Sequence, residues 1–382
     1  MLGFAPALLG HLQFLMEANY PGVKITPSGF TKMLIENNPK MNVSSVNGVK
    51  MSDLKRSTID GHIRDVRLKF LPRIKDDQIA DVDNCDNDFG FQYTETTLET
   101  PQFSKAGFQL EWGFVEQYQS EASNIASIGD PATGVLQEMV DQIMHTVNGL
   151  ITNIDKKLMN SVTFGVNVST GNALAKDINI NKDGTVLGLS DGMTEILSDV
   201  ADNEFVGDAL MSGSGIFNKY QIARANIGIN SAGLNIGSQS GYQWFFDLNS
   251  ATPFGTNHVG VFAKGAVGFV DLDRYIAWKT GAHGNSTFFT MKLPVESTPG
   301  GAPTMMNFNV QIKEVDCPTE AFDGYETRTM GRGYQIFISK QFGLFQQPTS
   351  AFQTGDRLEG NNGSLLYNIT NNCDPCPVPA AE

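Results

Sequence analysis

The sequence predicts an α+β fold in which one long helix lies across sheets whose strands precede and follow it. Apolar residues recur at every third or fourth position from Thr133 to Val162, the spacing of a helix with one buried face. Short runs in which apolar and polar residues alternate, as in half-buried strands, stand on both sides of this helix. Hydrophobic residues make up 41% of the chain, enough for a sizeable core. No apolar run approaches the roughly 18 residues of a transmembrane helix.

Residues 1–58 are predicted to form an irregular arm. Their short apolar stretches are separated by Pro21-Gly22, Pro27–Gly29 and Asn37–Pro39. Pro and Gly at this density end helices after about two or three turns. This segment therefore offers little for a core of its own.

Residues 59–125 are predicted to form a projecting β-arm ahead of the long helix. Three runs alternate between apolar and polar residues: Val66–Phe70, Phe89–Tyr93 and Phe108–Phe114. Long polar connections separate these runs, so the strands are expected to extend away from the main core.

The long helix is predicted to start at Pro131 and to act as a spine that lies across a sheet. About 28 residues without a helix breaker span about 42 Å at 1.5 Å per residue. Gly149, in the middle, costs roughly 1 kcal/mol relative to alanine. The core stripe of this helix consists of Leu136, Val140, Ile143, Val147, Leu150, Ile154 and Leu158.

The second half of the chain alternates short strands and helices and then returns to longer strands. Its last alternating runs are Phe289–Leu293, Met306–Ile312 and Tyr334–Ile338. The polar, Asn- and Gly-rich end of the chain, residues 349–382, is expected to be loosely held.

The net charge of −14 is unevenly distributed. Residues 1–75 hold 11 Lys+Arg and 5 Asp+Glu, a net charge of +6, so the remaining residues hold 16 and 36, a net charge of −20. An acidic body argues against binding of duplex nucleic acid, because phosphate neutralisation dominates that affinity. The basic segment is then either a solvated arm or an arm that lies on the acidic body of a neighbouring copy.

No pattern of catalytic, cofactor-binding or metal-ligating residues stands out, so the sequence predicts no enzyme and no cofactor. Cys373 and Cys376 form a single CxxC whose following prolines oppose a redox helix, and a disulfide is the alternative. The acidic run with Asp81, Asp83, Asp86 and Asp88 lacks the glycine and glutamate of a calcium loop. The role of the Cys373/Cys376 segment stays open.

The order of these elements resembles the major capsid protein of tailed bacteriophages, which has the Hong Kong 97-type fold. The resemblance lies in the basic arm, the β-hairpin with Arg64, the helix Thr133–Val162 and the Gly-Ala stretch Val259–Phe269. It implies an N-terminal arm at 1–58, an extended β-hairpin loop at 59–125, a spine helix with the first part of a peripheral domain at 126–184, an axial domain at 185–290, the rest of the peripheral domain at 291–348 and a C-terminal tail at 349–382.

The resemblance implies a structural subunit that self-assembles as hexamers and pentamers into an icosahedral shell around a phage double-stranded DNA genome. Such a protein is found in the virion after assembly in the cytoplasm of the bacterial host. Its expected partners are copies of itself, other virion proteins such as the portal, and a separate scaffolding protein. The enclosed DNA is not bound specifically, and no membrane takes part. The candidate contacts between subunits are Arg64, Arg67, Lys69, Phe108 and Trp112.

Two other functions stay open at this stage. An encapsulin-like compartment would use the same fold to house a cargo enzyme. A secreted β-rich surface or glycan-binding protein would fit the Asn/Gly/Ser-rich loops and the glycosylation sequons at Asn42, Asn285 and Asn368.

Overall fold

The computed structural model describes seventeen separate parts of the chain, from residue 10 to residue 370. These are residues 10, 13, 24–36, 50–56, 63–70, 94–98, 102–111, 131–179, 186–205, 209–213, 215, 242–272, 281–283, 286–295, 304–318, 330–352 and 354–370. They form an α+β fold with three sheets, as the alternating runs and the long helix predict. No helix in these parts is long and apolar enough to cross a membrane.

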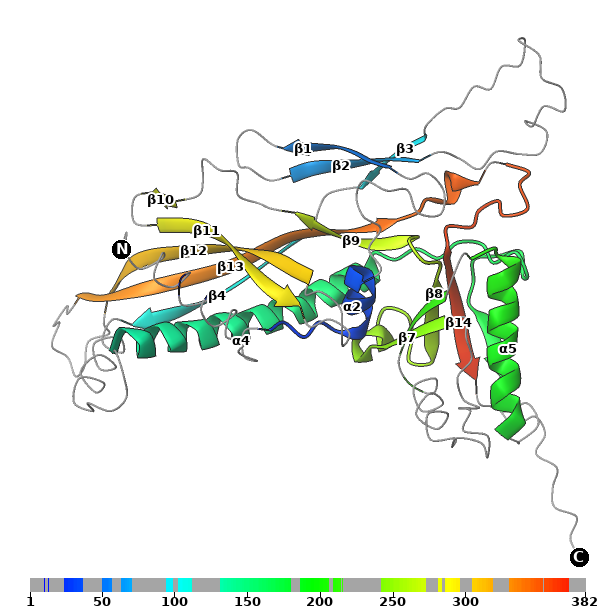
Figure 1. Cartoon of the computed structure of the whole chain (residues 1–382), viewed down its shortest axis with the longest axis horizontal. Helices are drawn as coiled ribbons and strands as arrows, with labels where there is room; N and C mark the ends of the chain where they lie inside the picture. The colour runs from blue at the N-terminus through cyan, green and yellow to red at the C-terminus, as the bar shows by residue number, and fades with distance from the viewer. Residues whose placement is uncertain are drawn as a thin grey trace, which may run out of the picture.

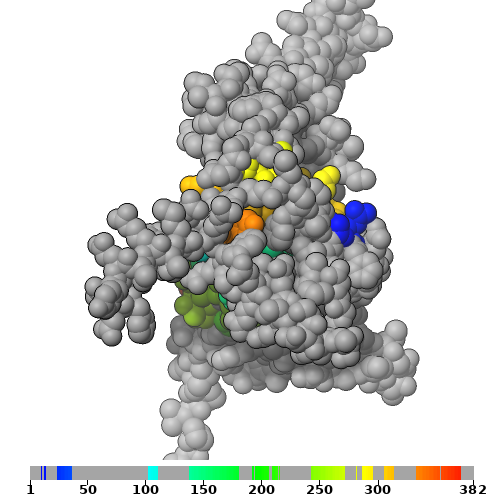
Figure 2. Space-filling view, turned by 90° about the vertical axis from the view of Figure 1, so that its left-hand side faces the viewer, coloured from blue at the N-terminus to red at the C-terminus, as the bar shows by residue number. Residues whose placement is uncertain are grey.

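The largest sheet has six antiparallel strands and runs along the length of the molecule (Figure 1). Its order is β10-β11-β12-β13-β4, and β9 pairs with the last part of β13. Its yellow and orange atoms reach the surface at one end of the molecule (Figure 2). The strands are β4 (Gln102–Glu111), β9 (Val267–Leu272), β10 (Gly281–His283), β11 (Ser286–Val295), β12 (Thr304–Pro318) and β13 (Met330–Gln346).

Helix α4 (Pro131–Asn160) lies along this sheet and contacts β4 and β13 (Figure 1). Its apolar stripe is its buried face, because that face packs on the inward side chains of the sheet, such as Ile336 and Phe342. The side chain of Leu136 lies outside the described residues. The other six residues of the predicted stripe are buried. Their exposed fractions are 0% for Val140, Ile143, Val147 and Leu158, 1% for Ile154 and 4% for Leu150.

A second sheet of five strands, with helix α5 (Val186–Asp202) beside it, stands at one end of the first (Figure 1). Its order is β5-β14-β8-β6-β7, and it has its own apolar core, which includes Met211, Val261 and Ile369. The strands are β5 (Lys176–Asn179), β6 (Ala209–Gly213), β7 (Tyr242–Phe246), β8 (His258–Phe262) and β14 (Ser364–Thr370).

The expectation of a loosely held tail is wrong for residues 354–370. Strand β14 lies between β5 and β8 inside the five-stranded sheet. Leu365, Tyr367 and Ile369 alternate along it and are at most 1% exposed, so the strand supplies part of the core. Cys373 and Cys376 lie outside the described residues.

The third sheet consists of β1 (Lys50–Arg56), β2 (Ile63–Phe70) and β3 (Thr94–Leu98), in that order. Strand β1 falls in the segment predicted to be an irregular arm, and the predicted strand Phe89–Tyr93 lies outside the described residues. Strand β4, predicted as part of the projecting arm, instead pairs with β13 in the six-stranded sheet. The alternating pattern of β4 predicts the strand correctly, but such a pattern does not specify the partner strand.

Helix α2 (Gly29–Glu36) shows that the arm contributes to the main core, contrary to expectation. Phe30, Met33 and Leu34 are 0% exposed, and the Phe30 ring lies 5.8 Å from the ring of Phe254. A Cβ atom on Gly29 would overlap the carbonyl oxygen of Phe246, so only glycine lets the helix approach this closely. This two-turn helix is stable because it is packed, since an isolated helix of this length is marginal.

Candidate assembly surfaces and buried polar clusters

The predicted contact residues Arg64, Arg67 and Lys69 lie on β2, the central strand of the three-stranded sheet. The strand register pairs Lys69 with Lys50 on one side and with Glu95 on the other. Arg67 and Lys69 are two residues apart in the regular part of the strand, whereas Arg64 lies where the pairing with β1 shifts register, between Asp65 and Ile63.

The other two predicted contact residues are separated from these. Phe108 lies on β4 opposite Ile336, and its side chain is half-buried against the main core. Trp112 lies outside the described residues. The structure therefore brings together the candidates on β2 and places Phe108 in a different sheet.

Two buried carboxylates hold the N-terminus of α2. The Phe30 N–H donates to Asp247 Oδ2 at 2.8 Å, and the Thr31 N–H and hydroxyl donate to Asp155 Oδ1 at 3.2 and 2.8 Å. Asp155 is 0% exposed on α4, and Asp247 is 2% exposed beside β7. The unsatisfied N–H groups at a helix start favour negative charge, so Asp155 fixes α2 to α4 and Asp247 fixes it to the end of β7.

The same carboxylates are close enough to repel each other. Burial raises the pKa of Asp247 to about 6, and the charge of Asp155 adds to the increase. Hydrogen bonds from the Phe30 and Asn249 N–H groups oppose this rise. At neutral pH the folded chain therefore holds a negative charge that the unfolded chain would solvate more favourably.

We expect Asp247→Asn to remove a pH dependence of the free energy of unfolding. A raised folded-state pKa means that protonation of Asp247 stabilises the folded chain as pH falls, and this gain is lost as pH rises through about 6. Between pH 7 and pH 5 the wild type should gain about 1.4 kcal/mol relative to Asp247→Asn. Urea unfolding at a series of pH values measures this, with the exposed Asp141→Asn as the control. If the free energies of unfolding of the wild type and of Asp247→Asn change with pH in parallel, the prediction is wrong.

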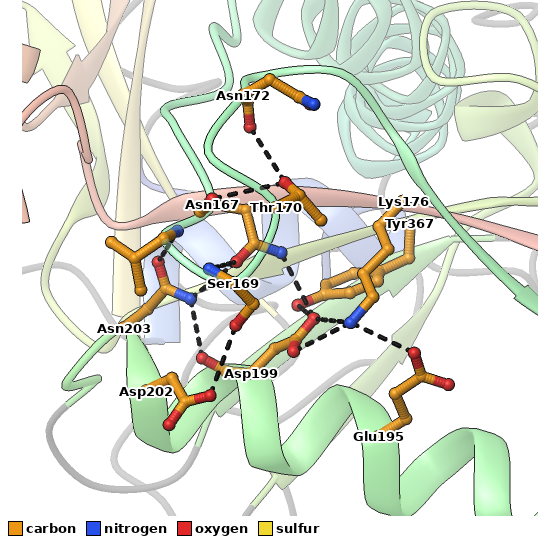
Figure 3. Close-up of polar contacts among 11 residues, drawn as sticks. Asn167, Ser169, Thr170, Asn172, Lys176, Glu195, Asp199, Asp202, Asn203 and Tyr367 are labelled. Carbon is orange, nitrogen blue, oxygen red and sulfur yellow. Dashed lines mark hydrogen bonds and ion pairs between the residues drawn. The ribbon is translucent and has the colours of Figure 1, made fainter.

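A second polar cluster ties α5 to the five-stranded sheet (Figure 3). Lys176 Nζ on β5 lies 2.8 Å from Asp199 Oδ2 and 3.1 Å from Glu195 Oε1, both on α5. Tyr367 on β14 and Asn167 donate to the same Asp199 oxygen at 3.2 and 3.3 Å. Burial lowers the pKa of Lys176, but Asp199 and Glu195 outweigh that effect and raise it overall. Burial, followed by the charge of Asp199, raises the pKa of Tyr367, so the phenol remains a donor.

Side-chain amides extend this cluster to the loop that follows α4. Asn203 Nδ2 donates to Asn167 Oδ1 at 2.9 Å, and both residues are labelled in Figure 3. Asn361 Nδ2 donates to Asn203 Oδ1 at 2.6 Å. All three residues are at most 4% exposed. These hydrogen bonds link the loop, α5 and β14. In the described parts of the chain no group of three or more His, Cys, Asp or Glu could hold a metal ion.

A buried lysine forms an ion pair at the point where the neighbouring strand of β13 changes from β12 to β9. Strand β12 pairs with β13 up to Ser339, and β9 pairs with it from Gln341 onward, so Lys340 stands between the two pairings. Lys340 is 0% exposed, and its Nζ lies 2.6 Å from Asp271 Oδ1 and 2.6 Å from the carbonyl oxygen of Asn307. Sequence reasoning missed this residue, although a lysine two positions after Ile338 interrupts the inward apolar pattern.

No family model and no curated protein sequence matches the chain. The chain is similar to solved phage structures. One from Mycobacterium phage Adephagia is 12% identical, over 85% of this chain and 92% of the other, with a TM-score of 0.42. The capsid asymmetric unit of cyanophage A-1(L) is 10% identical, over 90% and 93%, with a TM-score of 0.41. A virus-like particle from Pyrococcus furiosus is 9% identical, over 95% and 98%, with a TM-score of 0.36.

Proposed function

We propose that this chain is a structural subunit that self-assembles into a closed shell, a phage capsid of hexamers and pentamers around double-stranded DNA. The observation that carries the proposal is the three-stranded sheet β1–β3. Among the described residues its strand pairings join β1, β2 and β3, and β3 also lies beside β13 of the six-stranded sheet, while the chain enters the small sheet from α2 and leaves it for β4, which are both part of the main core. A sheet of three strands needs a covered hydrophobic face to be stable in water, and contact with neighbouring subunits would supply that cover.

The division into structural parts follows the same proposal, with boundaries adjusted to the sheets. The peripheral domain would be α4 with the six-stranded sheet, and the axial domain would be α5 with the five-stranded sheet, including β14. The extended loop would be β1–β3. The buried clusters at Asp155, Asp199 and Lys340 would keep these parts at fixed angles, as a closed shell requires of each subunit.

Two alternatives make different predictions. A compartment shell would enclose a cargo protein, whereas a capsid would enclose DNA, so the contents of purified shells distinguish them. The surface-binding alternative is weakened at one of its sequons, because Asn368 Nδ2 on β14 donates to Asp177 Oδ1 at 2.8 Å within the sheet. A glycan on that nitrogen would replace one of its two N–H donors and would have to fit beside Asp177.

Negative-stain electron microscopy of the purified full-length chain tests the proposal. Closed shells, tubes or hexameric sheets are the expected particles. Discrete particles of 41.6 kDa that persist at high protein concentration and high salt would count against a shell subunit.

Charge reversal on β2 should block assembly while leaving the subunit folded. We expect Arg64→Glu, Arg67→Glu and Lys69→Glu together to lower the assembled fraction at least about tenfold, because like charges would then face the acidic body of a neighbour. Pelleting of assembled particles measures that fraction, and circular dichroism checks the fold. Lys264→Glu, in an exposed turn, is the control. A normal yield of shells from the triple variant would remove β2 from the contact.

A further inference from the structure

Two buried carboxylates meet at a joint between α2, α4 and the end of β7, and both accept hydrogen bonds from the same asparagine. Asp247 accepts from the backbone N–H groups of Phe30 and Asn249, at 2.8 Å each. Asp155 of α4 accepts from the N–H and hydroxyl of Thr31 and, at 3.2 Å, from the side-chain amide of Asn249. These five donors are all neutral, and three of them belong to α2.

No cation balances these two negative charges within the described residues. Neither Asp155 nor Asp247 forms an ion pair there. The other ionisable side chains on the elements packed around the joint are exposed, remote or bound to other groups: Lys32 to Glu36 on α2, Asp271 of β9 to Lys340, Lys157 of α4 to Phe103 and Ser104, Lys156 exposed on α4, and Tyr242 at the far end of β7. Strand β6 and the 3₁₀ helix η3 (Leu248–Ala251) carry no ionisable side chain, and the remaining ones of α4 lie more than about two turns before Asp155. Asp155 is therefore the charge that faces Asp247.

Helix α2 can leave this joint without breaking a sheet. It has eight residues and packs through Phe30, Thr31, Met33 and Leu34, without strand pairings of its own. A short segment without strand pairing opens at a lower free energy than the core strands around it. When α2 leaves, three of the five hydrogen bonds to the carboxylates leave with it, and water takes their place. The open form therefore solvates the charges that the docked form buries.

We propose that α2 is a proton-linked latch, which undocks as a local unit while both sheets stay folded and whose docked form takes up a proton that its open form releases. Asp247 holds this proton. Burial and the charge of Asp155 raise the pKa of Asp247 to about 6 in the docked form, and contact with water in the open form returns it toward its ordinary value. Docking therefore strengthens as pH falls through about 6 and weakens as pH rises above it. At neutral pH α2 is held less tightly, so the arm can be repositioned without unfolding either sheet.

Hydrogen–deuterium exchange of the full-length chain tests the latch. After correction for intrinsic exchange rates, the protection of the α2 amides should rise about tenfold between pH 8 and pH 5, because the pKa of Asp247 falls from about 6 to about 4 on opening. Low concentrations of urea should leave exchange in α2 unchanged and accelerate it in the middle of α4, because local opening exposes little surface. Equal rates and equal urea dependence in α2 and α4 would overturn the proposal, since α2 would then open only with the whole fold.

Two variants separate the proton from the rest of the joint. Asp247→Asn should abolish the change with pH, because an amide does not titrate, whereas the control Asp141→Asn, at an exposed position of α4, should retain it. Thr31→Val removes the hydroxyl that donates to Asp155 at 2.8 Å, so it should lower α2 protection at every pH and keep the tenfold change.

Constant protection of α2 across this pH range in the wild type would overturn the latch. A tenfold change that persists in Asp247→Asn, or that disappears in Thr31→Val, would overturn it as well. The readout is the same whether or not the chain forms shells, so its outcome is independent of the proposed function.

Discussion

Ile143→Asp should leave no folded protein in the soluble fraction. Ile143 is 0% exposed in the middle of α4, where the helix packs on the six-stranded sheet. An ionised carboxylate there would be buried without a partner, and even a protonated one would lose the apolar contacts of isoleucine at a cost of about 4 kcal/mol or more. This is comparable with the whole stability of many domains, about 5–15 kcal/mol.

The control for this variant lies on the opposite face of the same helix. Thr152→Asp adds the same side chain at an exposed position and should remain soluble, with a melting temperature close to that of the wild type. Solubility after expression and circular dichroism of the purified chain measure both variants. A soluble Ile143→Asp chain with wild-type melting would show that α4 is not packed on the sheet as described.

The features that the sequence predicts best are those with long, regular patterns. The stripe from Val140 to Leu158 specifies both a helix and its buried face, because the spacing persists over several turns. The alternation in β11, β12 and β13 is equally persistent, and all three strands form where it occurs. Local pattern is sufficient here because each element buries one face along its whole length.

Partner choice and short elements could not be predicted in this way. The alternation around Phe108 indicates a strand, but only packing places β4 beside β13 instead of β2. Helix α2 carries Phe30, Met33 and Leu34 at helical spacing, yet two turns are too few to distinguish a docked helix from an irregular arm. Strand β14 is hidden by its polar surroundings, although Leu365, Tyr367 and Ile369 alternate.

The buried polar clusters leave a weaker signal, which is an interruption of an apolar pattern. Asp155 follows Ile154 on the buried face of α4, and Lys340 stands between Ile338 and Phe342 on β13. Each charged residue occupies a position where the pattern calls for an apolar one. Such interruptions mark where a buried partner must exist, but the partners are distant in sequence, Thr31 and Asn249 for Asp155 and Asp271 for Lys340, and only the fold identifies them.

Removing either charge of the Lys340–Asp271 pair should destabilise the chain, and removing both should cost less than the two losses combined. Lys340 is 0% exposed and contacts the rings of Phe269 and Phe308, whereas the side chain of Asp271 is 25% exposed. Asp271→Asn therefore leaves a fully buried ammonium, at a cost of about 3–5 kcal/mol. Lys340→Met leaves a carboxylate that water can partly reach, so its cost should be at the lower end of that range.

The double variant Lys340→Met/Asp271→Asn tests whether this loss comes from the unpaired charge. It contains no buried charge, and the introduced amide oxygen can still accept the hydrogen bond that the Asn307 N–H donates to Asp271 Oδ2 at 3.1 Å. Urea unfolding should show a coupling energy of about 2 kcal/mol or more, against about 0.5 kcal/mol for the surface pair Lys32–Glu36. Additive losses would mean that the two side chains act separately. Coupling would instead show that one ion pair holds β9, β12 and β13 together where the long strand exchanges partners.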